Sequence, residues 1–187
     1  MSGAGARASS NLLRIDALPI SVETCDAPGS GTLLRWNTDN LELLHAVAAC
    51  EEVVREARED HSALALEVAR VDARLRLVLR LLARLAASTV PPVREIRLGA
   101  AQVEWEAMSP GAPGTHAVAS IWLTPQVPEP LRLPGRLATA PPGPGGRSWV
   151  QLVYEGVSAP VVEALERHIF LHHRRAIALA RPVGQQS

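Results

Sequence analysis

The stretch from Thr38 to Ala87 contains no proline and no glycine and is built mainly from alanine, leucine, glutamate and arginine. A segment of this length without a helix breaker predicts one long α-helix, or two helices joined end to end. Good N-cap residues stand at its start: Asn37, Thr38, Asp39 and Asn40. The helical segment is therefore expected to occupy residues 38–90.

Apolar residues recur along this segment at alternating spacings of three and four. With the heptad frame starting at Val47, eleven of the twelve a and d positions are apolar. This repeat is the signature of a coiled coil, because a 3.5-residue period keeps one seam facing a partner. The larger apolar residues lie in its second half. The expected oligomerisation seam comprises Val54, His61, Leu64, Val68, Val71, Leu75, Val78, Leu82 and Leu85.

Two features of the seam bear on its assembly. Leu79 and Leu81 flank it and widen the apolar stripe beyond what a two-stranded coil buries, which favours a trimer or tetramer. A helix lying on its own domain is the alternative. His61 is the one polar residue at an a position and is interpreted as register-setting, with a pH-sensitive switch as the alternative.

Composition excludes several classes of function. The chain has 187 residues, its 19 basic residues are all arginine, and 19 acidic residues balance them. No lysine is present for Schiff-base or P-loop chemistry, and no cationic surplus is present for coating nucleic acid or an anionic membrane. Two cysteines support neither a disulfide framework nor a zinc site. With no signal peptide or membrane-spanning run, a cytoplasmic protein is predicted.

The pattern changes after Pro91 and Pro92 from helical to alternating. Five short strands are expected, two within 96–107 and one each at 118–123, 131–137 and 149–154, followed by a last helix from Ala159-Pro160. Turns rich in proline and glycine separate them. The expected fold class is α+β, with a small antiparallel barrel, a long heptad helix inserted in it or preceding it, and a C-terminal helix.

The segment from Val93 to Ala178 resembles the PilZ family. The likeness lies in the order of its elements: the signature strand from Ile96 to Trp105, a Gly114-Thr115 turn, the strand 118–123, a glycine-rich hairpin and a closing helix. The preceding arm and heptad helix resemble the atypical, tetrameric PilZ proteins of xanthomonads and their relatives. The resemblance implies a non-enzymatic module of cyclic di-GMP signalling, without a cofactor or a metal.

The nucleotide motif of that family is degenerate here. Cyclic di-GMP receptors of the family carry [Asp/Asn]-x-Ser-x-x-Gly on the signature strand, and those positions hold Arg97, Gly99 and Gln102. A cation replaces the acceptor for guanine, and the serine hydroxyl is absent. Arg-x-x-x-Arg occurs as Arg70 with Arg74, Arg76 with Arg80, and Arg80 with Arg84, and these pairs lie inside the heptad helix. Cyclic di-GMP is therefore not expected to bind by the usual motif.

The resemblance and the residues together give one organisation of the chain. Residues 1–12 are expected to be a disordered tail, 13–37 an arm, 38–90 the oligomerising helix, 91–180 the barrel with its closing helix, and 181–187 a tail. Because too few residues separate Arg84 from Arg97 for a full strand, residues 18–23 are hypothesised to supply the first barrel strand.

The expected function is that of a self-assembling adaptor. By resemblance, it would act in type IV pilus function, motility or virulence by contacting an unidentified protein partner, with a homotetramer favoured. Two alternatives stay open: a cyclic di-GMP receptor with an unusual arginine site, and a structural coiled-coil spacer.

Overall fold

A computed structural model describes residues 13–59, 63–86, 90–107, 111–125, 127, 129–141 and 148–180. The elements in chain order are β1 (Arg14–Thr24), α1 (Ser30–Glu59), α2 (Ala63–Ala86), β2 (Val93–Leu98), β3 (Gln102–Glu106), β4 (His116–Ile121), β5 (Leu131–Thr139), β6 (Trp149–Tyr154) and α3 (Ala159–Ala180). Both predicted tails, His61 and the glycine-rich turn at 142–146 lie outside the described residues.

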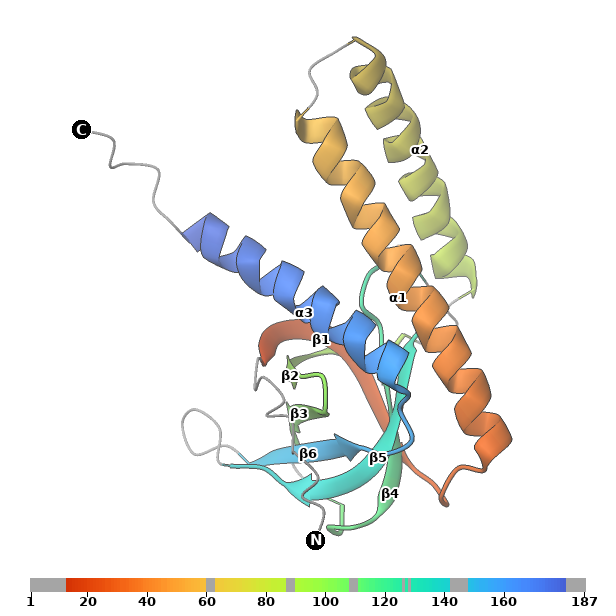
Figure 1. The fold of residues 1–187 in the computed structure, drawn as a ribbon, viewed down its shortest axis with the longest axis vertical. Coiled ribbons are helices and arrows are strands. Elements are labelled where there is room, and N and C mark those ends of the chain that lie inside the picture. The colour runs from red at the N-terminus through yellow and green to blue at the C-terminus, as the bar shows by residue number, and fades with distance from the viewer. Residues whose placement is uncertain are drawn as a thin grey trace, which may run out of the picture.

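The six strands form a closed antiparallel barrel in the order β1-β2-β3-β6-β5-β4 (Figure 1). β1 closes it by pairing with two strands in succession, through residues 14–19 with β2 and residues 20–24 with β4. The hypothesised first strand, residues 18–23, therefore lies in the barrel. Pro19 stands where the pairing passes from β2 to β4, and its carbonyl accepts a hydrogen bond from the Trp122 amide at 3.1 Å. A proline is tolerated at this point because its missing N–H is not required for a hydrogen bond to a neighbouring strand.

Strict alternation along the strands fills the barrel. Ile96 and Leu98 of β2 are fully buried, whereas Arg97 between them faces outward. The same period of two places Val103 and Trp105 of β3 inside. The apolar core is thus made by one face of every strand, and the other face carries the polar side chains discussed below.

Helix α1 begins at Ser30, so the prediction that it begins among Asn37 to Asn40 is wrong. Two of those residues dock the helix instead of capping it. The Asn37 side chain donates to the Gly156 carbonyl and accepts from the Ser158 amide, each at 2.8 to 2.9 Å. These tertiary hydrogen bonds use the side-chain amide of Asn37 that would otherwise be free to cap a helix. They hold α1 against the turn between β6 and α3.

Asn40 fastens α1 to the barrel wall. Its amide donates to the Arg132 carbonyl at 2.7 Å and its oxygen accepts from the Arg132 amide at 2.8 Å. β5 pairs with β6 only from Gly135 onward, so these two backbone groups have no partner on that strand. The side chain therefore completes the ladder of β5 as a neighbouring strand would.

Replacing Asn40 with alanine should lower the free energy of unfolding by about 2 kcal/mol, because it leaves two backbone groups of Arg132 unsatisfied beside a nearly buried site. Thermal and urea unfolding followed by circular dichroism would measure it. Thr38→Ala is the matched control, since this exposed hydroxyl bonds only to its own helix. Equal stability of the two variants would contradict the role assigned to Asn40.

The helical segment over residues 38–90 is neither one long helix nor two helices joined end to end as expected, because α1 ends at Glu59 and α2 returns along it toward the barrel (Figure 1). Chain length requires this return. Val47 is part of the barrel core, and an unbroken helix from there to Ala86 would run about 60 Å. The few residues before β2 span at most about 25 Å. β2 could not then pair with β1.

Helix α3 closes the barrel together with α1. Its apolar stripe of Val161, Leu165 and Ile169 is buried in the core, as are Leu43 and Leu44 of α1. Arg14 of β1 lies beside α3, with Nη1 and His168 Nε2 2.8 Å apart. Both helices therefore cover the barrel end at which β1 begins and β4 ends.

Candidate functional site

The degenerate motif lies on the hairpin formed by β2 and β3. Arg97 is in β2, Gly99 follows that strand, and Gln102 begins β3. The register places Arg97 opposite Glu104, and Glu104 opposite Gln151 of β6. These three outward positions form one cross-strand row, so their side chains can reach one another.

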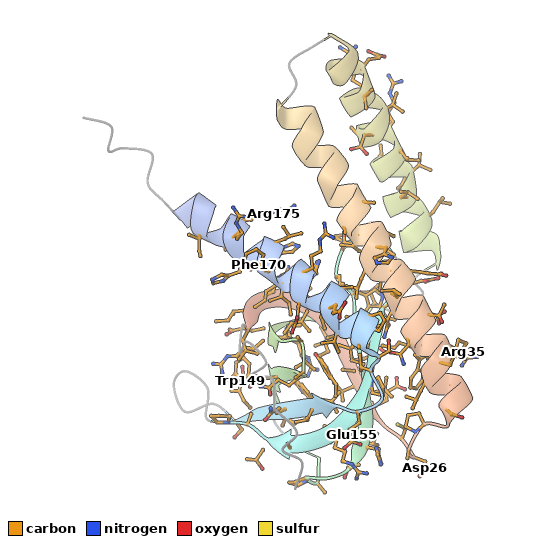
Figure 2. All side chains as sticks on the ribbon, in the orientation of Figure 1. Asp26, Arg35, Trp149, Glu155, Phe170 and Arg175 are labelled. Atoms are coloured by element: carbon orange, nitrogen blue, oxygen red, sulfur yellow. The ribbon has the colours of Figure 1, made fainter. Side chains whose placement is uncertain are left out.

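The side chains of the row are linked by hydrogen bonds, and Gln102 joins Gln151 to Glu104. Arg97 Nη1 lies 3.2 Å from Glu104 Oε2, and Gln102 Nε2 donates to Glu104 Oε1 at 2.8 Å. Gln151 Nε2 donates in turn to Gln102 Oε1. The guanidinium carbon of Arg97 also lies 4.1 Å from the ring centre of Trp149, a cation–π contact. Figure 2 shows Trp149 on the barrel wall.

Burial makes this arrangement a closed unit. The Glu104 carboxylate is only 5% exposed, and Arg97 is 20% exposed. A buried carboxylate is tolerated only when a cation and donors compensate it, and here both oxygens have partners. An incoming phosphate would have to displace Glu104 from Arg97 and leave a carboxylate buried without its cation.

The position of the motif's serine is crowded. A Cβ atom on Gly99 would lie 2.9 Å from Leu13 Cδ2 and 3.2 Å from the Gln102 carbonyl oxygen. The Gly99 carbonyl accepts a hydrogen bond from the Tyr154 hydroxyl at 3.3 Å. Desolvation raises the pKa of Tyr154 well above its ordinary value, so this hydroxyl stays protonated and able to donate. Gly99 is thus a packing and hydrogen-bonding position.

The predicted seam residues divide between α1 and α2. Val54 is on α1, Leu64 and Leu85 are on α2, and their side chains, like His61, lie outside what the structure describes. The five remaining seam residues, all on α2, are about half exposed in the single chain: Val68, Val71, Leu75, Val78 and Leu82. Val47, which opened the heptad frame, is 3% exposed and belongs to the barrel core instead.

Sequence reasoning missed Glu104, Gln151 and Trp149. The signal for Glu104 was present, because Arg97 and Glu104 are symmetric about the turn between two alternating strands. Gln151 and Trp149 could not be found this way, since their proximity depends on β6 pairing with β3 across a long stretch of sequence.

Other kinds of site find little support in the described part of the chain. Its residues contain no group of three or more histidine, cysteine or acidic side chains placed to hold a metal. Cys25 is exposed, and its pKa is raised by desolvation and then by the carboxylates of Asp26 and Glu23, which disfavours a metal-binding thiolate. None of the helices described is long and apolar enough to cross a bilayer.

Comparison with known proteins identifies the family. The family model of the atypical PilZ domain, described as a cyclic di-GMP receptor, matches residues 44–182. The chain therefore belongs to the atypical PilZ domain family, whose members are binding and signalling modules; no catalytic family is indicated. No curated protein matches.

A solved structure extends this likeness beyond the barrel. It is a pathogenic protein of Xanthomonas campestris, described as a tetrameric PilZ domain self-assembled via an unusual helical bundle. The two chains are 27% identical, with a TM-score of 0.67, over 89% of this chain and 91% of that one. The predicted resemblance to atypical PilZ proteins is thus confirmed.

Proposed function

We propose that this protein is a self-assembling adaptor of cyclic di-GMP signalling that does not bind the nucleotide by the usual motif. The observation that carries the proposal is the closed group of Arg97, Glu104, Gln102 and Gln151, in which the one cation at the motif already has an intramolecular anion. Its output would be contact with a protein partner, and its pathway, by resemblance, type IV pilus function, motility or virulence.

Self-assembly is supported by the surface of α2. Within the described chain, this helix exposes eight large apolar side chains, each 37% to 58% exposed: Val68, Val71, Leu75, Leu77, Val78, Leu79, Leu81 and Leu82. A soluble monomer rarely leaves so many adjacent apolar side chains in water. A second copy is the occupant proposed, because the similar Xanthomonas campestris protein is described as assembling through a helical bundle. Because that similar protein is described as tetrameric, a homotetramer is the assembly proposed.

The nucleotide part of the proposal predicts that purified protein gives no saturable heat with cyclic di-GMP at tens of micromolar in a calorimeter. The physical reason is that binding at the motif must break the Arg97–Glu104 pair inside a nearly buried site. Titrations at low and physiological salt separate specific binding from weak attraction to arginines. Saturable binding at micromolar concentration, lost in Arg97→Ala, would contradict the proposal.

The second candidate is a receptor that uses arginines elsewhere. The description of the family favours it, and so do Arg70 and Arg74, which lie four residues apart and exposed on α2. Four-residue spacing places both on one face of the helix. If nucleotide heat appears and persists in Arg97→Ala but is lost in Arg70→Ala/Arg74→Ala, this candidate replaces the first.

A further inference from the structure

A cavity of about 510 Å³ opens at the barrel end opposite α1 and α3. Its position follows from the topology. The helices cover the end where β1 starts, near Arg14, and where β5 starts, near Arg132. The cavity is lined instead by Thr24 at the end of β1, Arg94 at the start of β2 and Val150 at the start of β6.

The wall of this cavity is mostly apolar. Val22, Trp105, Leu137 and Val150 come from four different strands and present inward-facing side chains to it. A volume of this size is within the range of small-molecule sites, which are typically apolar with a few placed polar groups.

Arg94 supplies the single charge among the described lining residues. Strand alternation places it on the same side of β2 as the buried Ile96 and Leu98, but it stands near the open end of the strand, where it is exposed at the mouth of the cavity. In the part of the chain that the structure describes, no hydrogen bond or ion pair of the Arg94 side chain is found. Arg94 differs in this respect from Arg97, which lies three residues further along β2 and is paired with Glu104.

We infer that this cavity binds an amphipathic monoanion, namely a carboxylate with an extended apolar body. The guanidinium fork of Arg94 matches a carboxylate in two parallel hydrogen bonds, and the apolar wall takes the body. One cation balances one negative charge, so the site does not suit a doubly charged nucleotide. The inference is independent of the proposed adaptor function and of self-assembly.

The test compares decanoate with decanol, which share the apolar body and differ in charge. Calorimetric titrations use the full-length protein below the concentration at which decanoate forms micelles. Wild type should bind decanoate at least about tenfold more tightly than decanol, because a charge-assisted pair supplies at least that difference. Arg94→Gln should bind the two equally, and Arg94→Lys should keep a preference for decanoate.

Two further variants serve as a control and as a test of the cavity itself. Arg35→Gln removes an exposed arginine of α1 (Figure 2). Because Arg35 does not line the cavity, this variant should behave as wild type. Ala107→Phe fills the cavity and should weaken both ligands about equally. Circular dichroism checks that each variant is folded. The inference is overturned if wild type gives no saturable binding of decanoate, or if Arg94→Gln keeps the wild-type preference.

Discussion

The double substitution Val71→Asp/Val78→Asp should reduce the protein from an oligomer to the 20.0 kDa single chain. Both side chains are at least half exposed on α2 when the chain is alone, so the fold of the single chain should tolerate aspartate there. In the proposed bundle each aspartate would be buried without a partner in every copy, at a cost of several kcal/mol per charge. Light scattering coupled to size exclusion would measure the mass.

The control for this experiment is Ala73→Asp. Ala73 is exposed on α2, in the same turn as Val71, but on the side of the helix away from the a and d positions. It introduces the same charge without entering the seam, so the oligomer should persist. If the double variant keeps the wild-type mass, or if Ala73→Asp dissociates equally well, the assembly does not use this seam.

Gly135→Ala should be the most destabilising single substitution considered, with a loss of at least about 3 kcal/mol in the free energy of unfolding. The added Cβ would overlap the carbonyl oxygen of Val153 and lie 2.8 Å from its carbonyl carbon. These are backbone atoms of the paired strand β6, and Gly135 is in register with Tyr154. Relief requires separating β5 from β6, which opens the barrel.

Gly31→Ala is the matched control for that measurement. A Cβ on Gly31 meets nothing within 4 Å, and the residue lies in α1, where alanine favours the helix by up to about 1 kcal/mol over glycine. Unfolding of both variants should be followed at equal protein concentration, because self-assembly adds to apparent stability. A Gly135→Ala protein as stable as Gly31→Ala would show that β5 and β6 can separate at little cost.

Much of the barrel could be predicted from local pattern. The strand from Trp149 to Tyr154 was expected with the limits that the structure gives it, and the last helix begins at Ala159, as expected from the Ala159-Pro160 start. These elements have a strong period, of two in the strands and 3.6 in the helix, and proline or glycine at their borders. Such signals depend only on neighbours in the chain.

The errors concentrate in the helical segment. Asn37 and Asn40 have the side chains of N-caps, but the same hydrogen-bonding groups serve equally well to dock a helix on a strand or a turn. The break between α1 and α2 has no proline or glycine to mark it, and the heptad spacing continues through it. Local pattern therefore could not distinguish a continuous helix from two that fold back.

The candidate site shows the same division. The three degenerate motif positions, Arg97, Gly99 and Gln102, were recognisable in the sequence by their place on the signature strand. The burial of Glu104 and its pairing with Arg97 became visible only once β3 was seen to pair with both β2 and β6.

The α+β class, the resemblance to atypical PilZ domains, the replaced nucleotide motif and the apolar residues of α2 could all be read from the chain alone, because each is a property of residue type and spacing. Contacts in three dimensions were needed to establish that β1 closes the barrel, that α2 folds back along α1, that Glu104 neutralises Arg97 and that Arg94 faces a cavity. These features bring together residues distant in the chain or sharing one face of a closed barrel. They depend on which strands pair and on how far the segments between elements can reach, and neither can be read from neighbouring residues in the chain.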